Sequence, residues 1–233
     1  MVLQSIAFIP DGNRRYAKTH RISLIQSYQM GTQKAWDVID WLKPYKHIKS
    51  GTFYTLSLEN LTRKKTEIGL LLKVFEKEID KALNSPIFEE NDLSVQFVGR
   101  LSAFPKKIRD KMKKLQTRTE NYQSKTINLA LGYSGQAEIS DAAKQFAEDY
   151  KNNKISLSEM DEKKFRDYLY NPTLQDPDLI IRTSGTQRLS GFLTYQSAYS
   201  ELSFVNKYWP EFERSDLDFA VRDFENRQRN FGK

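Results

Sequence analysis

Short apolar runs alternate with longer helical patterns along almost the whole chain, and this alternation constrains the fold more than any other feature. Six runs have the composition of strands: Ser5–Ile9, Thr52–Leu58, Leu93–Gly99, Thr126–Tyr133, Leu179–Arg182 and Glu201–Val205. Strands that alternate with helices are typical of an α/β fold, in which the strands run parallel and the helices cover the sheet. We therefore predict an α/β fold built on a central, largely parallel six-stranded sheet flanked by helices.

The segments between these runs place apolar residues three and four positions apart, which indicates helices. They are Leu24–Leu42, Glu67–Leu83, Pro105–Asn121, Ala137–Tyr150 and Glu159–Tyr168. We expect N-terminal caps at Thr66, Ser158 and Ser215. The polar stretch 151–176 is interpreted as a surface excursion around a short helix, away from the chemistry. No linker or repeat divides the 233 residues, so residues 1–233 are predicted to form a single domain.

The composition restricts the metals and the chemistry that the chain can use. It contains no cysteine, which excludes disulfides, thiolate catalysis and cysteine-ligated zinc. Only two histidines, His20 and His47, are present, too few for a histidine-rich metal cage. Any bound metal is therefore expected to be a hard ion with oxygen ligands.

The formal net charge of +7 points to an anionic partner, which is a nucleic acid, a membrane surface or a phosphorylated small molecule. The lysine-rich helix around 105–118 is interpreted as a solvated basic surface. Because no nucleic-acid-binding module is recognisable, we predict no nucleic-acid partner. No stretch approaches the roughly 18 apolar residues of a membrane span, and no secretory signal is evident, so a soluble, cytoplasmic protein is predicted.

The first strand ends directly in a polar loop that suits an anionic ligand. In parallel α/β sheets, ligands bind at the carboxyl ends of the strands. Gly12 permits close approach of the backbone, and Arg14 and Arg15 add positive charge. A carboxylate at Asp11 makes sense there if a divalent cation bridges it to a phosphate. Taken alone, the segment also fits an ordinary Asp-Gly turn with two solvated arginines.

Two further strands end in polar clusters, at 57–63 and at 181–190. Arg182 and Arg188 stand six residues apart with glycine and hydroxyl side chains between them, an arrangement that suits a phosphate clamp. Surface ion pairs are the alternative for these arginines and for Arg63, but three such clusters together favour phosphate binding. The apolar stripe Leu70, Leu71, Val74, Phe75 and Ile79 fits either a long cavity or an ordinary core.

Five sequence blocks, in this order and spacing, resemble the cis-prenyltransferase family, which includes the undecaprenyl and dehydrodolichyl diphosphate synthases. The blocks are AFIPDGNRRYAK, TFYTLSLENLTRKKTEI, INLALGYSGQAEI, DLIIRTSGTQRLSGFLTYQSAYSELSFVNKYWPEF and NRQRNFGK. The resemblance spans nearly the whole chain. It implies an apolar tunnel for the growing product and a Mg²⁺-dependent reaction in which an allylic prenyl diphosphate is joined to isopentenyl diphosphate.

The resemblance also implies roles for single residues. Asp11 corresponds to the catalytic aspartate, which helps to hold Mg²⁺ and assists departure of the allylic diphosphate. That diphosphate would be surrounded by Gly12, Asn13, Arg14, Arg15 and Arg63. Asn60 and Ser57 would orient the second substrate and its departing proton, while Arg182, Arg188 and Ser190 would bind its diphosphate. Glu201 matches the second metal-associated carboxylate, and Glu67 the glutamate after the second motif.

Several positions depart from the family pattern. Leu24 and Tyr28 stand where an arginine and a histidine normally hold the allylic diphosphate, and Arg14 stands in place of a glycine. Thr186 and Gln187 replace an acidic residue and a histidine near the second diphosphate. We therefore expect Leu24 and Tyr28 to influence which substrate enters the first site.

Ordinary condensation in the cis configuration is the leading hypothesis from this resemblance. The alternatives are irregular coupling of dimethylallyl diphosphate, as in lavandulyl-type enzymes, prenyl transfer to an oxygen acceptor, and a non-catalytic subunit. The resemblance further implies a homodimer in which tail residues Arg227 and Arg229 reach the partner's second diphosphate site. Peripheral membrane contact through the lipid product is also expected.

Overall fold

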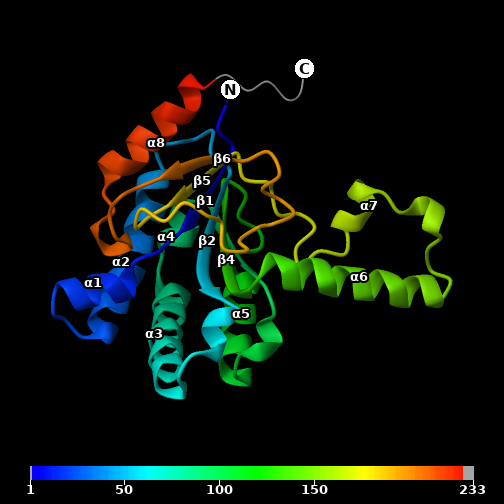
Figure 1. Ribbon diagram of the computed structural model, residues 1–233, viewed down its shortest axis with the longest axis horizontal. Coiled ribbons are helices and arrows are strands. Elements are labelled where there is room, and N and C mark those ends of the chain that lie inside the picture. The colour runs from blue at the N-terminus through cyan, green and yellow to red at the C-terminus, as the bar shows by residue number, and fades with distance from the viewer. Residues whose placement is uncertain (1, 228–233) are drawn as a thin grey trace.

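Six parallel strands form the centre of the computed structural model, which describes residues 2–227 (Figure 1). Their order across the sheet is β3-β4-β2-β1-β5-β6. The strands are β1 (Ser5–Ile9), β2 (Ser50–Ser57), β3 (Leu93–Val98), β4 (Lys125–Tyr133), β5 (Leu179–Arg182) and β6 (Glu201–Phe204). Every neighbouring pair is parallel. The predicted α/β class and six-stranded sheet are confirmed.

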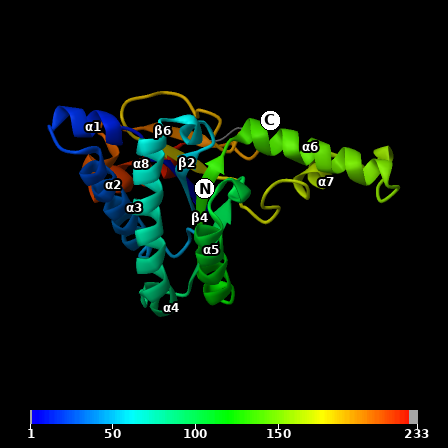
Figure 2. The same cartoon turned by 90° about the horizontal axis from the view of Figure 1, so that it is seen from below.

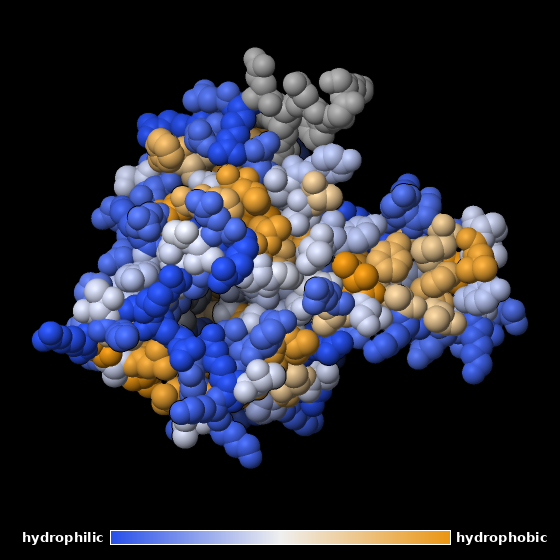
Figure 3. Space-filling model, in the orientation of Figure 1, coloured by the Kyte–Doolittle hydropathy of each residue, from blue (hydrophilic) through white to orange (hydrophobic). Residues whose placement is uncertain are grey.

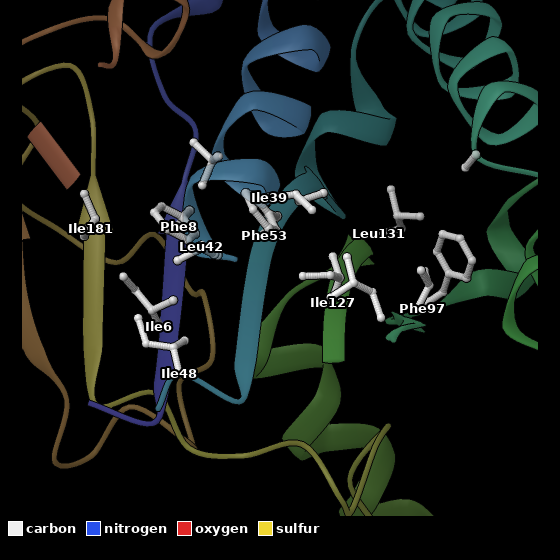
Figure 4. Packing of buried hydrophobic residues seen from close by; sticks show 14 of the residues in the cluster. Ile6, Phe8, Ile39, Leu42, Ile48, Phe53, Phe97, Ile127, Leu131 and Ile181 are labelled. Atoms are coloured by element: carbon white, nitrogen blue, oxygen red, sulfur yellow. The ribbon is translucent and has the colours of Figure 1, made fainter. Parts of the chain in front are cut away.

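Successive side chains of a strand point to opposite faces of the sheet, and the two faces are covered differently. Ile6 and Phe8 of β1 belong to the larger core, which lies under the helices. These helices are α2 (Leu24–Leu42), α3 (Lys65–Asn84), α4 (Ile87–Glu90), α5 (Lys106–Thr119) and α8 (Arg214–Asn226). Figure 4 shows Phe8 beside Phe53 of β2, and their rings stack with centroids 4.9 Å apart.

The opposite face of the sheet is covered mainly by irregular segments rather than by helices. Ala7 and Ile9 point to this side and contact a smaller core that includes Phe192 and Leu193 from the loop 183–200. The ring of Phe192 stacks on Tyr54 of β2 at a centroid distance of 4.6 Å. This packing fixes the loop 183–200 against the sheet and thereby positions the polar residues at its start.

Helices α6 (Gly135–Lys151) and α7 (Glu162–Arg166) form an arm that projects from the body (Figures 1 and 2). The arm carries its own aromatic contacts, such as Phe146 with Tyr168 at 5.9 Å, and orange residues gather on it in Figure 3. The predicted surface excursion 151–176 is therefore present, and its short helix is shorter than the predicted Glu159–Tyr168.

Helix starts were predicted less well than helix positions. The predicted caps at Thr66, Ser158 and Ser215 are wrong, because α3, α7 and α8 begin at other residues. Asp161 caps α7 by accepting the Lys164 N–H at 2.7 Å, and Glu213 precedes α8. Within residues 2–227, no helix is both long enough and apolar enough to cross a membrane.

Candidate active site

A cavity of about 980 Å³ extends from the carboxyl edge of the sheet into the space beneath α2 and α3. Figure 3 shows a hollow near α1 (Asn13–Thr19) among mainly hydrophilic residues. The polar part is lined by Asp11, Gly12, Asn13, Arg14, Arg15, Tyr28, Ser57, Asn60, Arg63, Arg182, Arg188 and Ser190. The deep part is lined by apolar side chains, among them Ile79, Ala82, Phe88, Val95 and Leu115. The cavity thus joins a cationic mouth to an apolar interior.

Asp11 lies at the cavity mouth because β1 ends two residues before it. Thr183 anchors its backbone, since the Asp11 N–H donates to Thr183 Oγ1 at 2.9 Å and the Thr183 hydroxyl donates to the Asp11 carbonyl at 2.7 Å. The Asp11 carboxylate contacts Arg182 Nη2 at 2.8 Å and Arg15 Nη2 at 3.2 Å. Register explains the first contact, because Ile9 of β1 pairs with Arg182 of β5.

Opposing influences act on the pKa of Asp11. Partial burial by itself raises the pKa, but hydrogen bonds from Arg182 and Ser184 and the charges of Arg182 and Arg15 outweigh it. The net result is a pKa below the ordinary value of 3.8. Asp11 is therefore an ionised carboxylate at neutral pH, and it faces a space into which a ligand can enter.

Gly12 is required by the turn that follows Asp11. Its φ of +106° lies in a region that side-chain-bearing residues rarely adopt. A Cβ atom there would also lie 2.6 Å from Tyr208 Cδ1 and 3.1 Å from the Cβ of Ser184. Any other residue would therefore displace the backbone that holds Asp11 and Asn13 at the cavity.

Arg182 is the most deeply buried cation of the site, with 5% of its surface exposed. Its guanidinium donates to Asp11, to Ser190 Oγ at 2.8 Å and to the backbone carbonyl of Arg188. Ser190 has a φ of +52°, so the loop holds a strained conformation to reach this contact. Burial with a single carboxylate partner makes Arg182 a fixed positive charge between Asp11 and the segment 188–190.

A second cluster surrounds Glu67, at the start of α3. One carboxylate oxygen of Glu67 accepts the Tyr28 hydroxyl at 2.9 Å and Arg63 Nη1 at 2.8 Å, and Arg14 Nε lies 3.7 Å away. Burial acts to raise the pKa of Glu67, but the Tyr28 hydrogen bond and the two arginine charges lower it below 4.5. Burial and the contact with Glu67 raise the pKa of Tyr28 to about 12. Tyr28 is therefore a neutral donor that holds Glu67.

Ser57 and Asn60 lie at the end of β2, where the strand pairing with β4 is irregular. The Asn60 side-chain amide donates to Ser57 Oγ at 2.5 Å, and the Asn60 backbone N–H lies 3.2 Å from the same oxygen. Because Ser57 Oγ accepts these contacts, its own proton can point toward the cavity. The pair thus presents a hydroxyl and an amide beside the Asp11 cluster.

Some predicted site residues are not part of the cavity wall. Leu24 lies at the start of α2 and does not line the cavity, although Tyr28 one turn later does. Glu67 lies behind Tyr28 and Arg63. Glu201 and Arg227 contact each other at 2.6 Å, away from the cavity. Arg229 lies outside the described residues.

The distance between Asp11 and Glu201 follows from the strand register. Glu201 pairs with Leu179 at the amino end of β5, whereas Asp11 follows β1 beyond the partner of Arg182. Three residues of strand correspond to about 10 Å. One chain therefore does not bring the two carboxylates to a common metal.

The residues at the mouth fit Mg²⁺ that is bound together with a diphosphate. Mg²⁺ keeps several water ligands and needs only one or two carboxylates when a phosphate completes its coordination. Asp11 supplies one ionised carboxylate. No group of three or more histidine, cysteine, aspartate or glutamate residues within residues 2–227 forms a metal cage. A metal held by protein ligands alone does not fit this site.

Three residues support the site without having been assigned a role from the sequence. Thr183 anchors the Asp11 backbone, Ser184 Oγ accepts from Arg15 at 2.6 Å, and the Tyr208 ring lies 5.7 Å from the Arg15 guanidinium. Thr183 and Ser184 stand inside the motif with Arg182, so their position in the sequence was a usable signal. Tyr208 stands in the same sequence block, but its contact with Arg15 depends on the fold.

The sequence as a whole matches the undecaprenyl diphosphate synthase family over residues 9–232. The chain belongs to this family. A tritrans,polycis-undecaprenyl-diphosphate synthase from Thermoplasma acidophilum is 40% identical over 98% of this chain and 88% of its own length. Its counterpart from Methanopyrus kandleri is 40% identical over 100% and 85%. Both are named as specific for geranylgeranyl diphosphate.

Two solved structures of prenyl diphosphate synthases have the same fold. Lavandulyl diphosphate synthase from Lavandula x intermedia, in complex with dimethylallyl diphosphate, superposes with a TM-score of 0.95 at 26% identity, over 100% of this chain and 99% of that one. A probable undecaprenyl diphosphate synthase from Campylobacter jejuni gives 0.81 at 27% identity, over 99% of both chains. The predicted family and transferase class are thereby confirmed.

Proposed function

We propose that the chain condenses an allylic prenyl diphosphate with isopentenyl diphosphate in the cis configuration and so makes a polyprenyl diphosphate. The observation that carries this proposal is a cavity of about 980 Å³ that joins the Asp11 and Arg182 cluster to an apolar interior. This volume lies at the upper end of the range for small-molecule pockets, about 300–1,000 Å³. A product with a charged head and a long hydrocarbon tail fits such a shape.

Different residues of the cavity would carry out different parts of the proposed reaction. Arg14, Arg15 and Arg63 neutralise the leaving diphosphate of the allylic substrate, and Arg182 and Arg188 hold the second diphosphate. As the bond from carbon to the leaving oxygen breaks, a new carbon–carbon bond forms, and the second substrate loses a proton that the departing diphosphate can accept. Ser57 and Asn60 lie where they can orient that proton, and the apolar walls exclude water from the cation-like carbon.

Mg²⁺, when bound, would neutralise diphosphate charge and assist the departure of the leaving group. Asp11 is the residue of the cavity wall that we propose to hold it. The contacts of Arg182 and Arg15 keep this carboxylate ionised and oriented toward the mouth. Glu201 would contribute only from a second copy of the chain, which is consistent with the homodimer that we propose.

We infer that geranylgeranyl diphosphate is the preferred allylic substrate. Two relatives that are 40% identical over nearly the whole chain carry this specificity in their names. The apolar interior of the cavity, which reaches Ala82 and Leu115, leaves room for a long donor. Peripheral contact with a membrane through the lipid product belongs to the same proposal, and a cytoplasmic location stays a prediction.

Irregular coupling of two dimethylallyl diphosphates is the second candidate. The TM-score of 0.95 to lavandulyl diphosphate synthase favours it, as does Tyr28 at the cavity wall. Its ten-carbon product, however, would leave most of the apolar interior unfilled. No observation favours transfer to an oxygen acceptor. A non-catalytic role is not favoured either, because Asp11 and Arg182 are both present at the cavity.

Product analysis with radiolabelled isopentenyl diphosphate tests the proposal. The enzyme is supplied in turn with dimethylallyl, farnesyl and geranylgeranyl diphosphate, with Mg²⁺ or with EDTA. We expect long cis-polyprenyl diphosphates, fastest from geranylgeranyl diphosphate, and none with EDTA. A ten-carbon branched product from dimethylallyl diphosphate alone would select the second candidate, and full activity in EDTA would exclude the proposed role of Asp11.

A further inference from the structure

Helix α5 has a net positive charge almost as large as that of the whole protein. It contains seven basic residues and one acidic residue, a net charge of +6, while the whole chain has +7. The buried side of the helix is apolar, with Ile108, Met112 and Leu115 in the core. The charge is therefore concentrated on the outer side of a single helix.

Some of these cations have structural partners. Lys107 and Lys111 both contact Glu76 of α3 at 2.8 Å, and Lys111 also contacts Asp80 at 2.7 Å. Arg118 donates to carbonyl groups at the end of α3, including that of Ser85 at 2.9 Å. These residues attach α5 to its neighbour, so they do not explain the remaining charge.

The other cations form a surface that we name the α5 basic face: Lys106, Arg109, Lys113 and Lys114. Spacings of three and four residues place them on one side of the helix, and all four are exposed. Lys106 contacts only Asp110, on the same helix. Arg109, Lys113 and Lys114 form no ion pair with any residue in 2–227.

The other side of the same helix closes the apolar cavity. Leu115, adjacent to Lys114, lines the deep part together with Phe88 of α4 and Ala82 of α3. In Figure 2, α3 and α5 lie side by side and α4 lies near one end of both. Because a helix with its side chains is about 10–12 Å thick, the deep end of the cavity lies within one helix diameter of the α5 basic face.

We propose that the α5 basic face docks on an anionic lipid bilayer and so brings the deep end of the cavity next to the membrane. The inference rests on the proposed function for its purpose, because a long prenyl product is insoluble in water and must reach a bilayer. The surface holds concentrated, unpaired positive charge, which complements anionic lipid headgroups. The sequence alone suggested a solvated surface, whereas the position of this surface beside the cavity suggests that it binds lipid.

Nucleic acid fits the same surface less well. The α5 basic face carries no aromatic side chain on which a base could stack, and single-stranded binders use such side chains. The adjoining cavity is apolar and suits a hydrocarbon tail rather than a base. Both observations favour a lipid surface over a polynucleotide.

Vesicle sedimentation without prenyl substrates tests the docking surface. The triple variant Arg109→Gln, Lys113→Gln, Lys114→Gln is compared with Lys144→Gln, Lys151→Gln, Lys163→Gln, which removes the same charge from exposed positions on the arm. Vesicles contain phosphatidylcholine with or without about 30% phosphatidylglycerol. Each cation near an anionic bilayer increases partitioning roughly fivefold, so the α5 variant should bind about a hundredfold more weakly. The arm variant should bind like the parent.

Several outcomes decide the question. An equal loss of vesicle binding in both variants would mean that only the total charge matters. Unchanged vesicle binding of the α5 variant would mean that the protein uses another surface. Either result overturns the proposal. Binding of the parent to a DNA duplex but not to anionic vesicles also overturns it. Parent binding should weaken at high salt, because exposed charges are screened. Turnover in detergent, measured in parallel, reports separately on the proposed function, and we expect it to be unchanged in both variants.

Discussion

The two edges of the sheet carry similar arginine–carboxylate pairs with different surroundings. At the carboxyl edge, Arg182 contacts Asp11 at 2.8 Å, and at the amino edge, Arg227 contacts Glu201 at 2.6 Å. Arg182 is almost fully buried beside a large cavity, whereas Arg227 is about one third exposed and is also held by Asp223 at 2.5 Å. The geometry of the pair is nearly the same, but only one pair faces a space that admits a ligand.

This difference follows from parallel topology. All strands of a parallel sheet end at the same edge, so the loops after β1, β2 and β5 converge there although they are far apart in sequence. At the amino edge, Arg227 contacts both Glu201 of β6 and Asp223 of α8, so these charges neutralise one another. An arginine–carboxylate pair therefore does not identify an active site, but its place on the sheet does.

The largest effect is expected from removing the carboxylate of Asp11. Asp11→Asn should lower kcat by about a thousandfold or more, because an amide neither binds Mg²⁺ as a carboxylate does nor neutralises Arg182. Steady-state kinetics with both substrates would measure this. Asparagine is chosen because its amide oxygen can still accept from buried Arg182, whereas Asp11→Ala would remove this partner altogether.

The matched control for this prediction is Asp141→Asn. Asp141 forms a similar ion pair with Arg100 at 2.8 Å, and neither residue lines the cavity. We expect the control to keep kcat within about threefold of the parent, because this partly exposed ion pair lies away from the cavity. An Asp11→Asn variant with parental activity would remove the central residue of the proposed site.

The next prediction concerns whether Asp11 of one chain and Glu201 of a second copy share one site in a dimer. Asp11→Asn and Glu201→Gln chains, each nearly inactive alone, are unfolded together, refolded and assayed. If Asp11 of one chain shares a site with Glu201 of its partner, half of the sites in a mixed dimer are intact, and statistical mixing should restore about a quarter of parental activity. A mixture as inactive as its components would show that Glu201 does not act across a dimer interface.

The sequence predicted the sheet and its helices because hydrophobic periodicity is a local signal. Every strand was located to within two residues, and α2 was predicted with its bounds as the structure has them. Helix starts were missed, because Asp161 and Glu213, rather than Ser158 and Ser215, precede α7 and α8. Which residue stands at the start of a helix depends on the exact path by which the chain enters it.

The candidate site was predictable in membership but not in internal contacts. Motifs at strand ends placed Asp11, Arg63 and Arg182 at one edge, and the structure brings all three to the cavity. The separation of Glu201 from Asp11 depends on the register of β6 against β5, which no motif encodes. The contact of Tyr28 with Glu67 spans two helices and could be found only from their packing.

A smaller effect is expected at the departures from the family pattern. Tyr28→His should lower the KM for allylic diphosphates by about tenfold, because a gained charge-assisted contact contributes about 1.5–3 kcal/mol. Leu24→Arg alone should change it less than threefold, since Leu24 does not line the cavity. The double variant should follow Tyr28→His in KM and favour regular head-to-tail products. If neither variant altered donor KM or product profile, Tyr28 would not influence the first site.

The smallest effect is expected from the charge of Glu67, measured as stability. Glu67→Gln should lower the Tm by about 1–3 °C at pH 7, because it keeps acceptor contacts to Tyr28 and Arg63 but removes a partly screened ion pair.

The folded-state pKa of Glu67 lies below 4.5, so the stabilisation from its charge is present above pH 4.5 and is lost as the pH falls through the folded value. Differential scanning calorimetry of both proteins should therefore give a constant difference in Tm from pH 8 to about pH 5.5. That difference should shrink below about pH 4.5, when protonation of the parent removes the same charge. A difference that persists unchanged into more acidic solution would mean that the shape of the side chain, rather than its charge, holds Arg63 at the cavity.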